Sequence, residues 1–176
     1  MYPFIRMFHQ LWRFRNKPLA LDEPHVSTIR CWPWDLDPWM ELNNGRTLTF
    51  YDLGRLPLFQ RNGIMRIVKQ NGWGFTVAGS SVRYRKRITA FEKITMRSRA
   101  IGWDDRFFYV VQSLWKADGS CANQVLIRAA MIEDGKMAPP EKLVAMLGWQ
   151  GPDPVLPDWV QAWIAAEDTR PWPPQI

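Results

Sequence analysis

Residues 35–63 read DLDPWMELNNGRTLTFYDLGRLPLFQRNG, and this stretch decides the fold. It starts as a loop rich in Asp, Pro and Trp and continues, from residue 44 to about residue 62, with apolar side chains on most sides of a helix. Such a helix is expected to be buried. Asn43 predicts its N-cap, Gly63 predicts its end, and Pro57 is expected to kink or shorten it.

The sequence around this helix predicts strands. One strand precedes the helix, and four follow it after the pattern changes at residue 72. Turn residues at 104–105 and 118–119 predict tight hairpins, so consecutive strands are expected to be antiparallel. A helix buried on most sides requires a sheet curved around it. The expected fold is α+β, with a five-stranded antiparallel sheet wrapped around one central helix and extra N- and C-terminal helices. The predicted strands span residues 26–32, 74–85, 93–101, 107–116 and 123–133.

Residues 3–15 predict a short amphipathic helix. Its apolar side chains (Phe4, Ile5, Phe8, Leu11 and Trp12) recur at helical spacing, and Arg6, His9, Gln10 and Arg13 fill the other side. Such a helix can lie on a membrane surface. Packing against the same domain or a partner subunit is the commoner use of an aromatic stripe.

The C-terminal part predicts two more helices, over residues 140–147 and 158–167, joined by a linker rich in Pro and Gly. The chain is therefore expected to divide into an N-terminal amphipathic segment (1–20), one central domain (21–148) and an extension rich in Trp and Pro (149–176).

The net charge of +6 limits the expected partners. A basic surface attracts anions, including nucleic acid, anionic lipid and the phosphates of coenzyme A. No nucleic-acid-binding motif accompanies the charge, so nucleic acid is not expected. The two cysteines and two histidines lack metal-ligand spacing, so no metal is expected. No apolar run reaches the roughly 18 residues needed to span a bilayer, and no signal peptide is evident. A cytoplasmic protein is expected, with peripheral membrane contact through residues 3–15 left open.

Residues 35–48 resemble the signature of hotdog thioesterases. In the 4-hydroxybenzoyl-CoA thioesterase-like branch, this signature reads Asp, three residues, His, one residue, Asn-Asn. Asp37, Asn43 and Asn44 occupy matching positions, whereas Glu41 stands where many relatives have His. An acidic residue and an Arg later in the helix match Asp52 and Arg55, and residues 81–87 and 99–104 resemble the strand region of the same family. The resemblance covers residues 25–133, so it identifies 21–148 as a hotdog thioesterase-like domain.

This resemblance implies hydrolysis of an acyl-CoA thioester to the free acid and CoA. It implies no metal or redox cofactor, because coenzyme A enters as part of the substrate. It also implies a homodimer or tetramer with sites at subunit interfaces. The alternative is a hotdog protein that binds acyl-CoA or acyl carrier protein without catalysis, which Glu41 in place of His leaves open.

Asp37 is the expected general base or nucleophile. The backbone N–H groups around Asn44, Gly45 and Arg46 are the expected oxyanion hole, because a helix N-terminus offers free amides and a positive dipole end. The alternatives are structural: Asp-Pro commonly opens a turn, and Asn43 and Asn44 can simply cap the helix. Glu41 is a weaker candidate, and a solvent-facing position is favoured for it.

Four basic residues follow in one short run. Arg83, Arg85 and Arg87 are expected on one face of a strand, with Lys86 on the other. They could bind the phosphates of coenzyme A or form a solvated sheet edge that discourages pairing. Asp52 and Arg55, three residues apart on the helix, are expected to form an ion pair.

Overall fold

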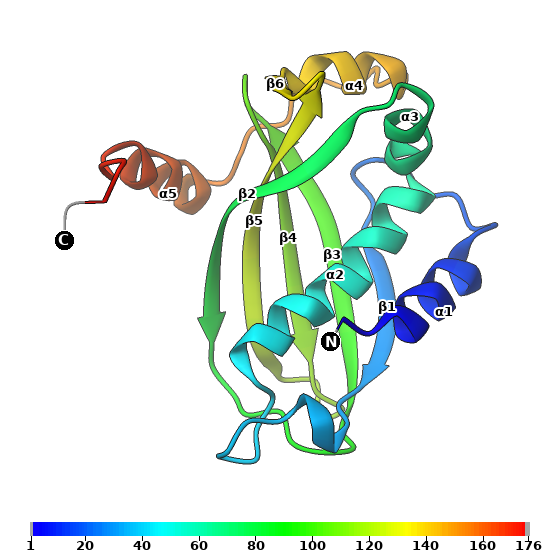
Figure 1. The fold of residues 1–176 in the computed structure, drawn as a ribbon, viewed down its shortest axis with the longest axis vertical. Coiled ribbons are helices and arrows are strands. Elements are labelled where there is room, and N and C mark those ends of the chain that lie inside the picture. Colours follow the sequence, from blue (N-terminus) through cyan, green and yellow to red (C-terminus); the bar gives the residue numbers. More distant parts are fainter. Residues whose placement is uncertain (1, 175–176) are drawn as a thin grey trace.

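The computed structural model describes residues 2–174. Its centre is an antiparallel sheet with strand order β1-β3-β4-β5-β2, to which a short sixth strand adds by pairing with β5 (Figure 1). This confirms the five predicted strands, and β6 is an addition. The bounds are β1 (His25–Arg30), β2 (Gly74–Tyr84), β3 (Lys93–Trp103), β4 (Phe108–Trp115), β5 (Cys121–Glu133) and β6 (Lys136–Ala138).

One long helix, α2, crosses one face of this sheet, and α1 lies beside it (Figure 1). The sheet curves around α2, which makes this a hotdog fold and confirms the predicted architecture. The helices are α1 (Phe4–Phe14), the 3-10 turn η1 (Pro33–Asp35), α2 (Asn44–Arg61), α3 (Ile64–Gln70), α4 (Pro140–Met146) and α5 (Asp158–Asp168). The short helix α3 was not predicted. It begins directly after Gly63, whose φ of 84° turns the chain between the two helices.

Burial on most sides of α2 explains its weak amphipathicity. Phe50, Tyr51 and Leu53 are completely buried although they point to different sides of the helix. Gly54 allows a close approach to β3, because a Cβ there would lie 2.7 Å from Met96 Sδ. Pro57 does not shorten the helix, which continues to Arg61.

The C-terminal extension covers the opposite face of the sheet. Tyr109 and Leu126 point away from α2 and pack with Leu156 and with Val160 of α5. Within residues 2–174, no helix has both the length and the apolar character needed to cross a bilayer.

Candidate active site

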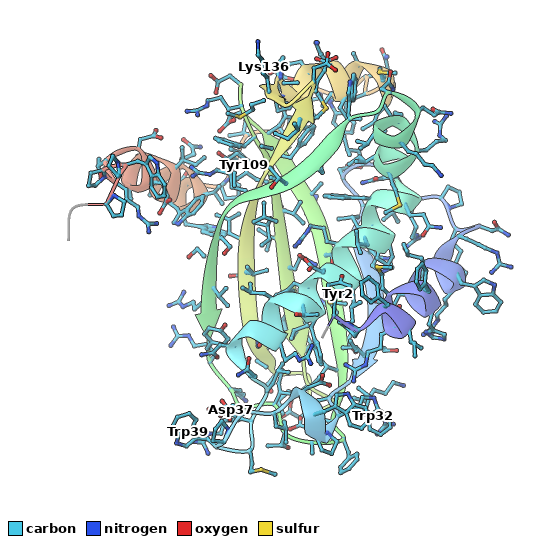
Figure 2. All side chains as sticks on the ribbon, viewed as in Figure 1. Tyr2, Trp32, Asp37, Trp39, Tyr109 and Lys136 are labelled. Carbon is cyan, nitrogen blue, oxygen red and sulfur yellow. The ribbon has the colours of Figure 1, made fainter. Side chains whose placement is uncertain are left out.

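The loop before α2 closes on itself as a tight hairpin. Leu36 and Leu42 form an isolated antiparallel bridge. Inside it, the N–H of Asp37 donates to the carbonyl of Glu41 at 2.8 Å, and the N–H of Met40 donates to the carbonyl of Asp37 at 3.0 Å. Met40 has a φ of 60°, which the tightness of the turn imposes. The hairpin fixes Asp37 in the loop beneath the first turn of α2 (Figure 2).

The carboxylate of Asp37 stabilises this hairpin. Its Oδ1 accepts hydrogen bonds from the N–H of Trp39 at 2.9 Å and of Glu41 at 3.3 Å. This is the Asx-turn geometry that Asp favours. The side chain therefore has the structural role considered for it, and a chemical role would depend on its other oxygen, Oδ2.

Asn43 caps α2 as predicted. Its Oδ1 accepts from the N–H of Gly45 at 2.9 Å and of Arg46 at 3.2 Å. Gly45 suits this cap, because a Cβ there would lie 3.2 Å from Asn43 Oδ1. Two of the three amides expected to form an oxyanion hole are thus already hydrogen-bonded. Of the three amides predicted to form the oxyanion hole, the N–H of Asn44 is therefore the remaining candidate.

A cavity of about 230 Å³ lies beside this first turn of α2. It is bounded by the loop before α2, the first turn of α2, the chain after β2, and β5. Its lining residues are Glu41, Leu42, Asn44, Thr47, Tyr84, Arg85, Lys86, Arg87, Ile88 and Asn123. We call it the α2 cavity. It brings together Asn44, Glu41 and three of the four predicted phosphate-binding residues.

A second hollow, of about 470 Å³, lies against other residues of the same turn, including Asn43, Gly45 and Arg46. Tyr2 and Trp34 also line it. The start of α2 therefore borders two openings. Asp37 lines neither of them.

The basic run does not form the predicted strand face. β2 ends at Tyr84, and the N–H groups of Arg85 and Lys86 both donate to the carbonyl of Ala122, at 2.8 and 3.0 Å. Arg85, Lys86 and Arg87 therefore form a turn at the cavity rather than alternating on a sheet. Arg83 is inside β2, is exposed and does not line the cavity.

Glu41 faces solvent only in part, because it forms an ion pair. Its Oε2 lies 2.9 Å from Nε of Arg87, and its side chain is about one-third exposed. The pair joins the loop before α2 to the turn after β2. Because Arg87 is largely exposed, the pair contributes no more than about 1 kcal/mol to stability.

Buried polar residues at the cavity floor were not predicted. The hydroxyl of Tyr51 donates to Oδ1 of Asn123, and both side chains are buried. Burial raises the pKa of Tyr51 far above its ordinary value, so it remains a hydrogen-bond donor. Thr47 also lines this cavity, and its Oγ1 donates to the carbonyl of Asn43 at 3.3 Å.

A second polar network ties α2 to the sheet. Arg55 is buried, pairs with Asp52 as predicted, and donates from Nη1 to Oε1 of Gln112 at 3.0 Å. Gln112 donates in turn to the carbonyl of Tyr51 and to Oγ of Ser98, each at 2.8 Å. Burial raises the pKa of Asp52, although the guanidinium of Arg55 opposes this shift. This network fixes the position of the helix that carries the site.

The cysteines and histidines are dispersed. Cys31 is buried and Cys121 half-buried, both as free thiols. His25 is buried beneath α1, whereas His9 is exposed on it. Over the described residues 2–174, no three His, Cys, Asp or Glu side chains come together as a metal site would require.

An antiparallel sheet curved around one helix defines a hotdog protein, here with a polar cavity where that helix starts. The chain belongs to the thioesterase-like superfamily, whose model matches residues 31–164. This confirms the family inferred from the Asp37 and Asn43-Asn44 pattern.

The chain is also similar to known proteins in sequence and in structure. Protein THEM6 of Xenopus laevis is 28% identical over 169 residues, which cover 94% of this chain and 80% of that protein. The probable thioesterase YbaW of Escherichia coli superposes with a TM-score of 0.66 at 19% identity, over 70% of this chain and 96% of its own. A thioesterase from Thermus thermophilus, complexed with coenzyme A and Zn, superposes with a TM-score of 0.57 at 23% identity, over 83% of this chain and 95% of its own. The two solved structures share the fold.

Proposed function

We propose that the protein hydrolyses acyl-CoA thioesters to the free acid and CoA at the α2 cavity. One observation supports this most directly. In a member of the thioesterase-like superfamily, Asn44, the first residue of α2, and a basic turn border the same cavity. The helix end stabilises developing negative charge, and the basic turn suits the phosphates of CoA. The coenzyme A bound to the related Thermus thermophilus thioesterase supports this ligand class.

In the proposed reaction, Asp37 takes a proton from water through Oδ2, which requires the loop before α2 to turn this oxygen toward the α2 cavity that Asp37 does not line in this structure. The water oxygen attacks the thioester carbonyl carbon, and the N–H of Asn44 stabilises the negative charge that develops on the carbonyl oxygen. The carbon–sulfur bond then breaks. The sulfur of CoA takes the proton held by Asp37, which gives a free thiol and a carboxylic acid.

The basic turn would bind the CoA part of the substrate. Arg85 and Lys86 are exposed at the cavity, whereas Arg87 is paired with Glu41. Contacts between charged donors and phosphate are stronger than neutral hydrogen bonds. Arg85 and Lys86 are therefore the proposed phosphate contacts, and Arg83, which does not line the cavity, is the weakest of the four.

One specific observation favours a second function. Several groups of the proposed site already form hydrogen bonds or ion pairs within the protein. Oδ1 of Asp37 holds the hairpin, the N–H groups of Gly45 and Arg46 hold the cap, and Glu41 is paired with Arg87. These constraints would suit a protein that binds acyl-CoA or an acyl carrier protein without hydrolysis. Both functions use the same cavity, so catalysis must be measured directly.

The replacement Asp37→Asn separates the two functions. The amide oxygen of Asn can still accept from Trp39 and Glu41, so the hairpin is kept while the base is lost. We expect release of free thiol from a panel of acyl-CoAs to slow by about 10²–10⁴, with the Kd for CoA unchanged in calorimetry. If the unmodified protein binds CoA but hydrolyses no member of the panel, the binding function holds instead.

We also propose that the protein self-associates through β2. This strand lies at the edge of the sheet and pairs only with β5 on its inner side. Its outer backbone edge can pair with another strand, and edges left open in this way promote association. A second copy of the chain is the proposed partner, as a homodimer or tetramer.

A further inference from the structure

Helix α1 carries four large apolar side chains on the side that faces away from the protein. Phe4, Ile5, Phe8 and Trp12 are exposed by 56%, 87%, 62% and 63% of their surface. We call these four residues the outer α1 face. The sequence pattern alone favoured packing of this stripe against the same domain or a partner subunit, and the structure does not pack these four side chains against the domain.

Polar contacts fix this orientation from the other side of the helix. Arg6 pairs with the buried Asp35 at 2.9 Å, and Nε2 of Gln10 donates to the carbonyl of Thr28 at 3.0 Å. Phe14 is buried with its ring edge-on to His25. Turning α1 to bury the outer face would break these contacts. The exposed stripe is therefore a stable feature of the fold.

The apolar surface continues onto the 3-10 turn. Trp34 is 65% exposed and borders one hollow together with Phe4 and Ile5. Its ring stacks on Trp32, with 5.3 Å between ring centroids. The outer α1 face is thus extended by a second segment of chain into one continuous apolar surface.

The charge around this surface is basic. The first acidic residue of the chain is Asp22. Arg13, Arg15 and Lys17 are exposed at the C-terminal end of α1, and the guanidinium of Arg15 lies 4.6 Å from the ring centroid of Trp12. Exposed aromatic residues beside basic ones, on a helix without acids, match the requirements of an anionic bilayer interface.

We propose that the outer α1 face docks on an anionic lipid surface. Phe4, Ile5, Phe8 and Trp12 enter the interface, while Arg13, Arg15 and Lys17 contact the head groups. Self-association of this face about a two-fold axis is disfavoured, because its basic residues would meet the same basic residues with no acids to pair with them. An anionic lipid surface supplies the opposite charge.

Docking has a consequence for the proposed active site. Tyr2 and Trp34 border the hollow that reaches Gly45 and Arg46 at the start of α2. Trp34 also belongs to the docking surface. Binding to lipid would therefore bring the hollow lined by Tyr2 and Trp34 close to the bilayer, which is a source of acyl chains.

The test is co-sedimentation of the full chain with vesicles, comparing phosphatidylcholine alone with phosphatidylcholine mixed with phosphatidylglycerol. We expect binding to the anionic vesicles and loss of binding in high salt. Ile5→Ser with Trp12→Ser is expected to weaken binding at least about tenfold. The matched control is Val155→Ser with Trp172→Ser, which replaces an aliphatic and a Trp side chain of the C-terminal extension that are at least as exposed.

A charge variant provides the second arm. Arg13→Gln with Lys17→Gln should reduce binding to anionic vesicles, while Arg66→Gln with Lys69→Gln on α3 should not. Circular dichroism checks that each variant is folded. The proposal is overturned if the unmodified chain stays in the supernatant, or if the Ile5/Trp12 variant and the Arg13/Lys17 variant both sediment as it does. A change of oligomeric state in the Ile5/Trp12 variant without any effect on vesicle binding would assign the face to a second copy instead.

Discussion

Nε of Arg87 lies 2.9 Å from Oε2 of Glu41, and this ion pair crosses the α2 cavity. It joins the residue that stands in place of the family His to one of the residues expected to bind phosphate. The carboxylate of Glu41 and the guanidinium of Arg87 partly neutralise each other's electrostatic effect on a ligand in the cavity. The pair therefore weakens both roles that the sequence suggested for these two residues.

Releasing Arg87 should improve substrate binding. We expect Glu41→Gln to lower KM for acyl-CoA up to about fivefold, since exposed ion pairs are worth no more than about 1 kcal/mol. The value of kcat should stay unchanged, because Glu41 has no chemical step in the proposed reaction. Steady-state kinetics measure both quantities, with Glu133→Gln, which breaks the ion pair with Lys142 away from the cavity, as the control. A large fall in kcat would show that Glu41 takes part in the chemistry.

The basic turn should determine affinity for the CoA group. Replacing Arg85 and Lys86 by Gln is expected to raise KM by about tenfold or more, because charge-assisted contacts to phosphate are lost. The effect should shrink as salt is added, since salt screens exposed charges. Arg66→Gln with Lys69→Gln removes the same charge from α3 and is the control. Equal KM changes in the two variants would mean that net charge alone attracts the substrate.

The fold was predictable because its signals are local. Apolar residues on most sides of residues 44–61 predicted the buried helix, and turn residues at 104–105 and 118–119 predicted the hairpins. The short helix α3 was missed because its seven residues follow α2 after a single glycine. Packing of the apolar side of α1 against the domain was not found, because two contacts, Arg6 with Asp35 and Gln10 with Thr28, hold its polar side inward.

The site was only partly predictable, because its contacts join distant segments. The Asp37 and Asn43-Asn44 pattern located the start of α2, and the cap by Asn43 followed from residue type. The hydrogen bond from Tyr51 to Asn123 spans 72 positions. A single polar residue inside a strand does not reveal such a partner. The pairing of Glu41 with Arg87 could not be predicted for the same reason, because the two residues lie far apart in the sequence.

Removing the Tyr51 hydroxyl should affect both stability and the site. Tyr51→Phe leaves Oδ1 of Asn123 buried without its donor, so we expect the free energy of unfolding to fall by about 1–3 kcal/mol. Because Asn123 lines the α2 cavity, KM should also rise. Tyr109→Phe, which removes a hydrogen bond to Asp104 on the other face of the sheet, is the control for stability alone. Urea unfolding and kinetics on both variants distinguish the effects, and unchanged KM in Tyr51→Phe would remove Asn123 from the site.

Association through β2 should be sensitive to one exposed side chain on that strand. Val77 on β2 and Val26 on β1 are about half-exposed, at 48% and 46%, on opposite edges of the sheet. We expect Val77→Glu to shift the oligomer toward monomer, because it places like charges in the interface of two copies. Val26→Glu should leave the mass unchanged. Light scattering after gel filtration measures this, and a protein that is already monomeric refutes the proposed interface.

His25 should make stability depend on pH. It is completely buried, Arg61 contacts its Nδ1 at 3.0 Å, and burial with the nearby guanidinium lowers its pKa from 6.5 to about 4. Between these two values the unfolded chain binds a proton that the folded chain does not. The free energy of unfolding therefore decreases as pH falls through this range, by up to about 3 kcal/mol.

Urea unfolding at about pH 7 and about pH 5 measures this loss, with His25→Gln as the comparison. The variant cannot take up the proton in either state. It should be less stable than the unmodified protein near neutrality, because it packs less well against Phe14. Its stability should nevertheless fall less on acidification, since only the remaining titratable groups respond. Parallel stability curves for the two proteins would mean that His25 is protonated as readily in the folded chain as in the unfolded one.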